Sequence, residues 1–518
     1  MIPKSVHSLS FIVAFLLIAT LATGTAVRQL EVQQPSVETK NGIIHGTIDS
    51  CTPDVRQFLG IPYAEPPLNE LRFAPPTKKQ PFDRPIQATQ VPPSCMQYLT
   101  TNSTVYTREV LEFNLGGLNK TSDHISEDCL TLGVWAPIAV EETRLLPVLI
   151  FLHGGGFRTG GQDQPYDQPS QWVQRSKGHI VVILNHRLNF FGFPNAAGQE
   201  DGKRNVGLMD QRLAIEWVRD NIEDFGGDPA RLVLWGQSAG AIATGYYAFA
   251  YYDDPIVKGF IMNSGTELVD RTTDDPTHSY FSWVASQVGC DNRSAAEELG
   301  CMQAVDAKRI ENVIQVQQDS GQAPYISFQP IVDNTTVFSD WVGMANIGRL
   351  AKLPVIIGSN INDGVPFAPY NTKGVDKDLA WNQTMDYFFC PAWKSATVRI
   401  AHGIPVYRYL YSGNFTNISP KPWLGTWHST DLPMIFGTHS NYRGNSTQLE
   451  YETSFMMQDS WFSFANGITR PNLGNADWPL FEDTESGIVA IFGKGMAVGV
   501  ESVHGMEQKC RKDFFPQS

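Results

Sequence analysis

A serine lies at the centre of the pattern Gly-x-Ser-x-Gly, directly after a short apolar run. Ser238 stands between Gly236 and Gly240, and residues 232–235 before it read Leu-Val-Leu-Trp. An apolar strand that leads into this pattern and then into small helix-forming residues is typical of a nucleophile elbow, a tight turn that lifts a serine hydroxyl out of a sheet. The two glycines fit, because a side chain at either position would collide with neighbouring backbone. Because the five-residue pattern also occurs by chance, further segments must support Ser238 as a candidate nucleophile.

A second apolar run, residues 148–152, leads directly into His-Gly-Gly-Gly-Phe at residues 153–157. This glycine run matches the element that contributes to the oxyanion hole of lipases and esterases. Glycines let the backbone approach a substrate oxygen, and fixed N–H donors stabilise the negative charge that develops there. We expect the donors to be the amides of Gly155, Gly156 and Ala239. Phe157 fits either a substrate-lining or a core position.

A serine hydroxyl also needs a base, usually a histidine oriented by a carboxylate. In α/β-hydrolases both follow the serine, and Asp363 fits the carboxylate, because it comes shortly after the apolar run 354–357. Its Asp-Gly pair is equally compatible with a simple turn. His428, in a loop with apolar flanks, fits the base, and His402, beside a glycine and before a strand, is an alternative. The histidines after Ser238 are His278, His402, His428, His439 and His504.

Apolar, β-rich runs alternate with helical patterns, such as residues 214–222, which carry apolar side chains on one face. Near-continuous apolar strands separated by helices indicate a parallel sheet covered on both faces. The sequence therefore predicts an α/β fold of the α/β-hydrolase type, with a mostly parallel central sheet and the site at the carboxyl ends of its strands. The expected strands are residues 148–152, 179–184, 232–235, 259–262, 354–357 and 406–411.

The composition is that of a globular protein. The chain has 518 residues, of which 42% are hydrophobic and 18% charged, and a net charge of -14. The negative charge argues against a nucleic-acid partner, which requires a basic face. Length alone suggests about three domains, but no linker, repeat or low-complexity block divides the chain. We therefore expect one large domain over residues 27–518.

The N-terminus has the features of a secretory signal peptide. Lys4 precedes a mostly apolar run, residues 9–22, and small residues follow up to Ala26, after which we expect cleavage. The alternative is an uncleaved anchor, although the run is short for a membrane span. No later segment is apolar and long enough for stable membrane insertion, so we expect a secreted protein.

Sequons and cysteines also suit secretion. Seven cysteines suggest disulfides, whose pairing the sequence does not determine, although Cys290 and Cys301 are close enough to close a small loop. The candidate glycosylation sites are Asn102, Asn119, Asn292, Asn334, Asn382, Asn414, Asn417 and Asn445.

Several further segments carry a family resemblance. From about Val37 to Cys510 the chain resembles the type-B carboxylesterase/lipase family, also called cholinesterase-like, and is most similar to fungal secreted carboxylesterases. The segments that carry the resemblance, besides those around Ser238, are residues 58–67 (FLGIPYAEPP), 127–137 (EDCLTLGVWAP), 210–214 (DQRLA), 261–265 (IMNSG), 431–433 (DLP) and 478–479 (WP).

The resemblance implies a triad of Ser238, Asp363 and His428, which raises His428 above His402. It implies that Ser264 is a buried serine that supports the triad. It also implies disulfide bonds, which leave Cys51 over: Cys95–Cys129, Cys290–Cys301 and Cys390–Cys510.

Three departures from the family pattern bear on the substrate. The acid is Asp363 where most relatives have the longer Glu, so its loop must come closer to His428. Gln237 replaces the Glu of cholinesterases, which removes a charge that attracts cationic substrates. The segment between Cys95 and Cys129 contains no Trp, so it lacks the aromatic platform that binds choline. We therefore do not expect a cholinesterase.

We expect a secreted serine hydrolase that cleaves short- to medium-chain or small-molecule esters through an acyl-enzyme, without a metal or other cofactor. The alternatives are a lipase for longer acyl chains, an acyltransferase that uses the same triad, and a non-catalytic binding protein.

Overall fold

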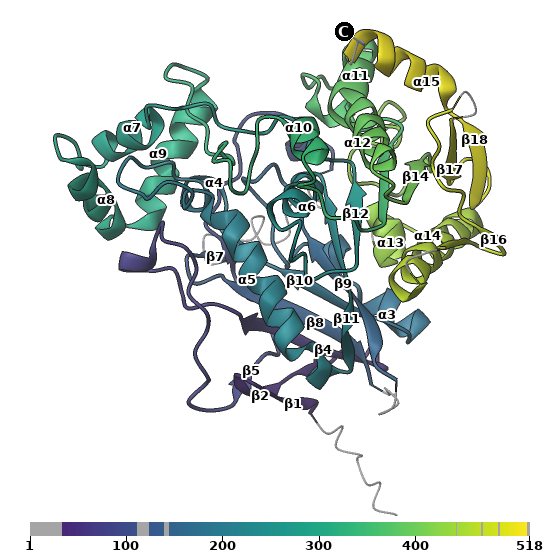
Figure 1. Cartoon of the computed structure of the whole chain (residues 1–518), viewed down its shortest axis with the longest axis horizontal. Coiled ribbons are helices and arrows are strands. Elements are labelled where there is room, and N and C mark those ends of the chain that lie inside the picture. The colour runs from purple at the N-terminus through teal and green to yellow at the C-terminus, as the bar shows by residue number, and fades with distance from the viewer. Residues whose placement is uncertain are drawn as a thin grey trace, which may run out of the picture. The chain divides into compact units, whose positions relative to one another are not determined.

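A computed structural model describes residues 34–110, 124–138, 144–441, 443–467, 470–484 and 487–514. A large twisted sheet runs through this part of the chain (Figure 1). In spatial order its strands are β18 (Val498–Ser502), β17 (Ile488–Phe492), β14 (Val406–Tyr411), β13 (Val355–Asn360), β12 (Gly259–Asn263), β11 (Gly227–Gln237), β9 (Leu146–Leu152), β10 (Ile180–Leu184), β8 (Thr131–Pro137), β4 (Val55–Pro62) and β3 (Thr47–Ile48).

The central strands, from β10 to β17, are parallel, and the outer pairs are antiparallel. Five of the parallel strands, β9, β10, β12, β13 and β14, are buried along their whole length. Near-continuous apolar sequence suits such strands, since both faces of a parallel sheet are covered by helices. The predicted α/β fold with a mostly parallel sheet is confirmed.

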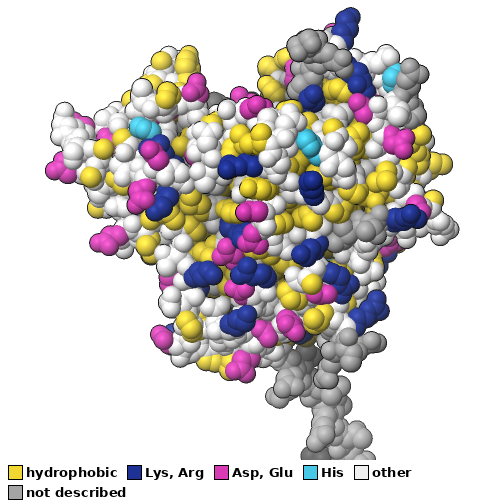
Figure 2. All heavy atoms as spheres, in the orientation of Figure 1, with side chains coloured by type: hydrophobic (Ala, Val, Ile, Leu, Met, Phe, Trp, Pro, Cys, Tyr) yellow, Lys and Arg dark blue, Asp and Glu magenta, His cyan; other side chains and the backbone are white. Residues whose placement is uncertain are grey.

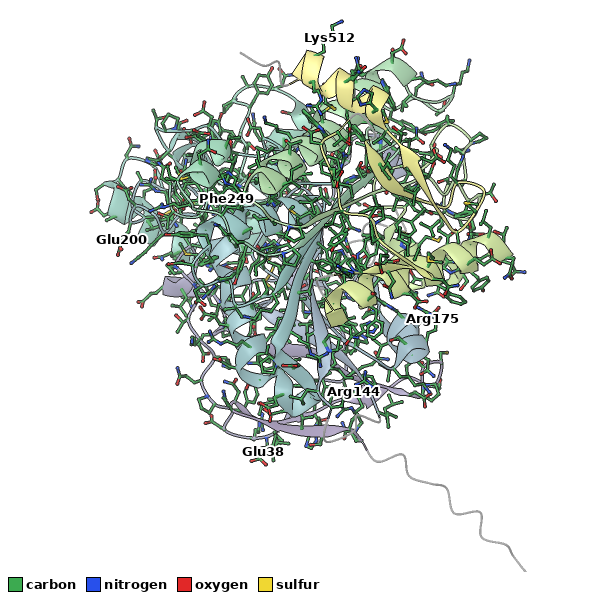
Figure 3. The ribbon with its side chains drawn as sticks, turned by 45° about the vertical axis from the view of Figure 1, so that its right-hand side comes forward. Glu38, Arg144, Arg175, Glu200, Phe249 and Lys512 are labelled. Carbon is green, nitrogen blue, oxygen red and sulfur yellow. A yellow bond between two sulfur atoms is a disulfide. The ribbon has the colours of Figure 1, made fainter. Side chains whose placement is uncertain are left out.

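Successive side chains of a strand point to opposite faces, and the two hydrophobic clusters follow this rule. On β9, Val148, Ile150 and Leu152 belong to one cluster, whereas Leu149 and Phe151 belong to the other. The first cluster also takes in α5 (Val206–Asn221), α6 (Ala239–Ala250) and α12 (Cys390–Ala401). The second takes in α3 (Ser170–Ser176), α13 (Leu432–Phe436) and α14 (Gln448–Gly467). In Figure 3 the labelled Phe249 of α6 and Arg175 of α3 lie on opposite sides of the strands.

A separate group of helices, α7 (Ser279–Gln287), α8 (Ala295–Ala304) and α9 (Ala307–Ser320), packs around a third apolar cluster. Among the shorter helices, α10 (Trp341–Asn346) contributes to the first cluster, and α1 (Val105–Arg108) and α11 (Lys377–Thr384) contribute to the second. Helix α15 (His504–Lys509) lies near the end of the described chain.

Three disulfide bonds link the pairs that the family resemblance implies, namely Cys95–Cys129, Cys290–Cys301 and Cys390–Cys510. Cys51 is free and exposed. Within the described ranges, no helix combines the length and the apolar character needed to cross a membrane. On the face drawn in Figure 2, acidic and basic side chains are intermixed.

One of the expected glycosylation sites is unfavourable for a glycan in the folded protein. Asn417 is buried, and its side-chain amide donates to His439 O at 3.0 Å and to Ser446 Oγ at 3.2 Å. A glycan replaces a hydrogen of that amide and needs room that a buried nitrogen lacks. The expected site Asn119 and the segment 1–26 lie outside the described residues. The remaining sequon asparagines are exposed: Asn102, Asn292, Asn334, Asn382, Asn414 and Asn445.

A buried ion pair fastens α5 to the segment after β10. The Arg187 guanidinium donates to both carboxylate oxygens of Asp210, at 2.8 and 2.7 Å, and to Ala74 O at 2.8 Å. The Arg187 backbone amide also donates to Asp210, at 3.0 Å. Only 3% of the arginine side chain and none of the aspartate side chain is exposed. A buried cation that loses its partner is costly to keep in the fold.

We therefore expect Asp210→Asn to lower the free energy of unfolding by about 3–5 kcal/mol, because it leaves Arg187 charged, buried and uncompensated. The measurement is urea unfolding followed by tryptophan fluorescence. The matched control is Asp220→Asn, which makes the same charge change beside Arg219 in a partly exposed pair and should cost less than about 1 kcal/mol. Equal losses for the two variants would contradict the assignment.

Candidate active site

Ser238 occupies the tight turn between β11 and α6. Its backbone has φ 54° and ψ -121°, and its amide donates to Asn263 O of the neighbouring strand at 2.9 Å. A Cβ on Gly236 would lie 2.1 Å from Gly240 O, and a Cβ on Gly240 would lie 2.0 Å from Leu152 O. Neither position can accept a side chain without moving backbone. The two glycines of the sequence pattern are therefore required by this turn.

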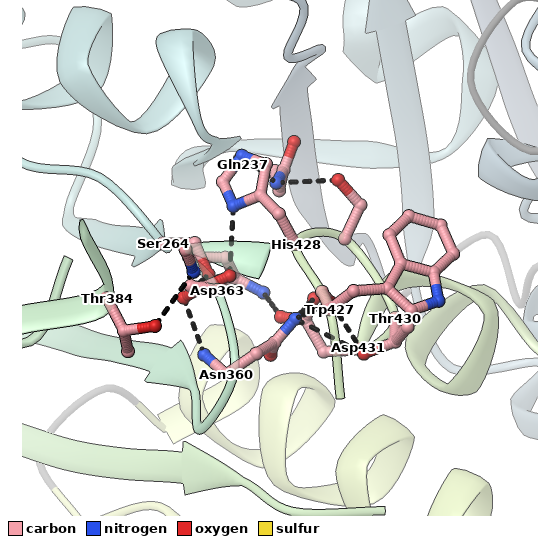
Figure 4. A network of polar contacts seen from close by, with 12 residues as sticks. Gln237, Ser264, Asn360, Asp363, Thr384, Trp427, His428, Thr430 and Asp431 are labelled. Carbon is pink, nitrogen blue, oxygen red and sulfur yellow. Dashed lines mark hydrogen bonds and ion pairs between the residues drawn. The ribbon is translucent and has the colours of Figure 1, made fainter. Parts of the chain in front are cut away.

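His428 and Asp363 come together from two separate loops (Figure 4). His428 Nδ1 and Asp363 Oδ1 are 2.9 Å apart. The other carboxylate oxygen accepts hydrogen bonds from the Asn360 amide at 2.7 Å and from Ser264 Oγ at 2.8 Å. Asp363 is fully buried, so these donors replace the water that a carboxylate otherwise binds.

A direct tie between the two loops lets the short aspartate reach the histidine. Asn362 Oδ1 accepts from the Thr426 amide at 3.1 Å and from Thr426 Oγ1 at 3.2 Å. Gly425 has φ 58°, and a Cβ there would lie 2.3 Å from Asn362 Oδ1. The two loops thus pack closely at Gly425, an arrangement that suits an acid one methylene shorter than Glu.

A second buried carboxyl group, Asp431, fixes the loop that carries His428. Asp431 accepts hydrogen bonds from Asn263 Nδ2 and Tyr409 OH, each at 3.0 Å, and from Asn360 Nδ2 at 3.2 Å. Burial and then the nearby charge of Asp363 raise the pKa of Asp431 above its ordinary value. The sequence marks this residue only by its place in the Asp-Leu-Pro motif, which did not reveal its role.

The side chain of Gln237 contacts the other ring nitrogen of His428. Gln237 Nε2 lies 3.2 Å from His428 Nε2 and 2.9 Å from Ser429 Oγ. An amide N–H that donates to Nε2 and a carboxylate that accepts from Nδ1 together select the imidazole tautomer with its proton on Nδ1. Ser238 Oγ has no hydrogen bond to the described residues, and both Ser238 and His428 line the same cavity.

The glycine run after β9 adopts backbone conformations that favour glycine. Gly155 and Gly156 have φ 112° and 64°, and a Cβ on Gly155 would lie 2.0 Å from Thr159 O. Throughout the described residues, none of the Gly155, Gly156 and Ala239 amides donates a hydrogen bond. His153 packs beneath the run, with Nδ1 2.8 Å from Gly154 O, and burial lowers its pKa to about 3. The ring therefore stays neutral.

These groups open into a cavity of about 460 Å³. Phe367 and Phe388 pack against the His428 ring, with centroids 5.2 and 4.7 Å away. Phe157 does not line the cavity but packs in the core against Phe193. The remaining lining includes Tyr98, Tyr106, Arg158, Arg271, Asp319 and Gln329.

The other histidines after the serine lie elsewhere. His402 follows α12 and borders a different surface pocket. His439 interacts with Ser446 Oγ at 2.7 Å, and His278 caps α7. His428 is the histidine that the fold places beside Asp363 and in the cavity with Ser238.

The sheet, the helices on both its faces and the serine at a strand-to-helix elbow define an α/β-hydrolase. The chain belongs to the carboxylesterase family, whose model matches residues 33–387 and 378–508. It is 43% identical over 505 residues to the chlorogenic acid esterase of Aspergillus niger, covering 93% of this chain and 96% of that protein. It is 38% identical over 514 residues to secreted lipase 5 of Gibberella zeae, covering 93% and 94%. Acetylcholinesterase of Bungarus fasciatus is 26% identical over 505 residues, covering 86% and 80%.

The contact between Gln237 and His428 predicts a pH effect. In Gln237→Glu a carboxylate faces Nε2 and stabilises the imidazolium, so hydrolysis needs a higher pH to free the base. We expect the acid limb of the kcat/KM profile for a neutral ester to move up by about one pH unit. The control is Gln329→Glu, which places the same charge in the cavity beside Gly156 O and should shift the limb less. An unchanged limb in Gln237→Glu would contradict the contact.

Proposed function

We propose that this carboxylesterase hydrolyses small, soluble esters with Ser238 as the nucleophile, His428 as the base and Asp363 as the carboxylate that orients it. The observation that carries the proposal is the His428–Asp363 contact of 2.9 Å at a cavity that Ser238 also lines. The donors for the oxyanion are Gly155, Gly156 and Ala239, whose amides are unoccupied among the described residues. Ser264 positions Asp363 through its hydrogen bond of 2.8 Å.

The tautomer of His428 supports this assignment. With the proton on Nδ1, the lone pair of Nε2 can take a proton, and the Gln237 amide lies 3.2 Å from Nε2. In the reaction His428 exchanges the Gln237 amide for the Ser238 hydroxyl and takes its proton as the hydroxyl attacks the ester carbonyl. The alcohol leaves with a proton from His428. The base then activates water, which cleaves the acyl-enzyme and restores Ser238.

The cavity favours small esters over long acyl chains. Its wall combines the rings of Tyr106, Phe367 and Phe388 with polar side chains of Thr104 and Gln329, a mixture suited to a compact aromatic or short-chain ester. One relative is named for chlorogenic acid. A lipase activity is the second candidate, because another relative is a secreted lipase. Acyl transfer to an alcohol uses the same residues.

We also propose that the protein is secreted. Three disulfide bonds require an oxidising compartment to form, and six sequon asparagines are exposed. Residues 1–26, the proposed signal peptide, lie outside the described ranges.

Ser238→Ala should reduce kcat/KM for 4-nitrophenyl esters by at least about 10⁴-fold and abolish labelling by an organophosphate probe, because no other group replaces the nucleophile. An acetyl-to-palmitoyl series on the wild type should peak at short chains. The control Ser286→Ala removes an exposed hydroxyl on α7 and should leave both readouts unchanged. Retained hydrolysis in Ser238→Ala would reject the nucleophile, and a peak at palmitoyl would favour the lipase.

A further inference from the structure

Arg271, which forms no ion pair with the described carboxylates, lines the cavity that holds Ser238 and His428. Arg271 lies on the segment that follows β12, and its side chain is partly buried. Its guanidinium lies over two rings, 5.2 Å from the centroid of Tyr387 and 6.0 Å from that of Phe367. Among the described residues, no ion pair and no hydrogen bond engages the Arg271 guanidinium, whose contacts are the two rings.

The surroundings leave this cation only partly compensated. Burial lowers the pKa of Arg271 from its ordinary value, which means that the charged form loses hydration without gaining an equivalent partner. The two rings contribute cation–π attraction, which does not use the N–H donors. A guanidinium presents five such donors in a planar fork that matches a carboxylate. The fork is available to an anion that enters the cavity.

The charges nearby favour an anion. Arg158, on the glycine loop, lines the same cavity and adds positive potential. Two acidic residues in the vicinity accept hydrogen bonds from neutral groups and not from Arg271, although the charge of Asp270 acts on Arg271 and favours its cationic form. Asp319 accepts hydrogen bonds from Thr100 Oγ1 at 2.5 Å and from Thr101. Asp270, which does not line the cavity, accepts from Thr272.

Phe367 sets the position of the cation relative to the site. The centroid of the Phe367 ring lies 6.0 Å from the Arg271 guanidinium and 5.2 Å from the centroid of the His428 ring. The cation and the imidazole therefore lie along the same wall of the cavity. Since Arg271 and Ser238 line the same cavity, a substituent on an ester held at Ser238 can reach the guanidinium.

We propose that Arg271 is a specificity residue that binds a free carboxylate on the ester substrate, so that the preferred substrates are esters that also carry a carboxylic acid. The inference rests on the hydrolysis proposed above and deepens it. Arg158 adds to the positive potential of the cavity, whereas the guanidinium of Arg271 makes the direct contact with the substrate carboxylate.

The test compares acids with their own methyl esters. One pair carries the carboxylate on the acyl side, 4-nitrophenyl hydrogen succinate and methyl 4-nitrophenyl succinate. The other carries it on the alcohol side, 4-acetoxybenzoic acid and methyl 4-acetoxybenzoate. For each pair the readout is the ratio of kcat/KM for the acid to that for the methyl ester. Arg271→Gln should lower this ratio by about 10-fold or more in at least one pair, mainly through KM, because it removes a charge-assisted contact.

Two controls separate recognition from structure. Arg349→Gln removes an arginine that lies over Tyr252 outside the cavity and should leave the ratio unchanged. Arg271→Lys keeps the charge without the fork and should restore part of the ratio. If the variants do not fold, the wild type still provides a test, because the KM of the preferred acid should rise between 0.05 and 0.5 M NaCl more than that of its methyl ester.

Equal changes for acid and methyl ester in both pairs, or a ratio insensitive to salt, would overturn the proposal. A different result would reject the proposed hydrolysis itself: the wild type would turn over neither methyl ester and would not hydrolyse 4-nitrophenyl acetate.

Discussion

A buried carboxylate needs hydrogen-bond donors, and in this protein two of the three donors for Asp363 come from distant parts of the chain. The Asn360 amide lies at the end of β13, Ser264 lies directly after β12, and His428 lies on the loop after β14. Each donor stays in place only while these parallel strands keep their register. Removing one donor leaves the buried carboxylate partly unsatisfied, which destabilises the folded state. The geometry of the site therefore depends on the register of the sheet.

Asp431 extends the same constraint to a second carboxyl group. Asn360 serves both acids, since its backbone amide donates to Asp363 and its side chain to Asp431. Burial and the charge of Asp363 raise the pKa of Asp431. One asparagine at the end of β13 thereby orders two loops around one imidazole.

The parts that the sequence predicted are those set by local backbone. The elbow at Ser238, the glycine run and the strands follow from residues that are neighbours in the chain. His428 was separable from His402 only through the family resemblance, because the partner of a histidine depends on contacts across more than 60 residues. The contacts of Gln237, Asp431 and Arg271 escaped prediction for the same reason. So did the burial of Asn417, whose sequon looks like any other.

The electrostatics of the cavity differ from those needed for a cationic substrate. Gln237 is neutral where the cholinesterase pattern has an acid, and its side-chain amide contacts His428 and Ser429. Arg158 and Arg271 add positive charge to the cavity wall. The proposed chemistry at Ser238 depends on the strand ends, whereas these charges come from the loops after them. The same sheet can therefore position the same catalytic groups while a few loop residues determine whether a cationic or an anionic substrate is preferred.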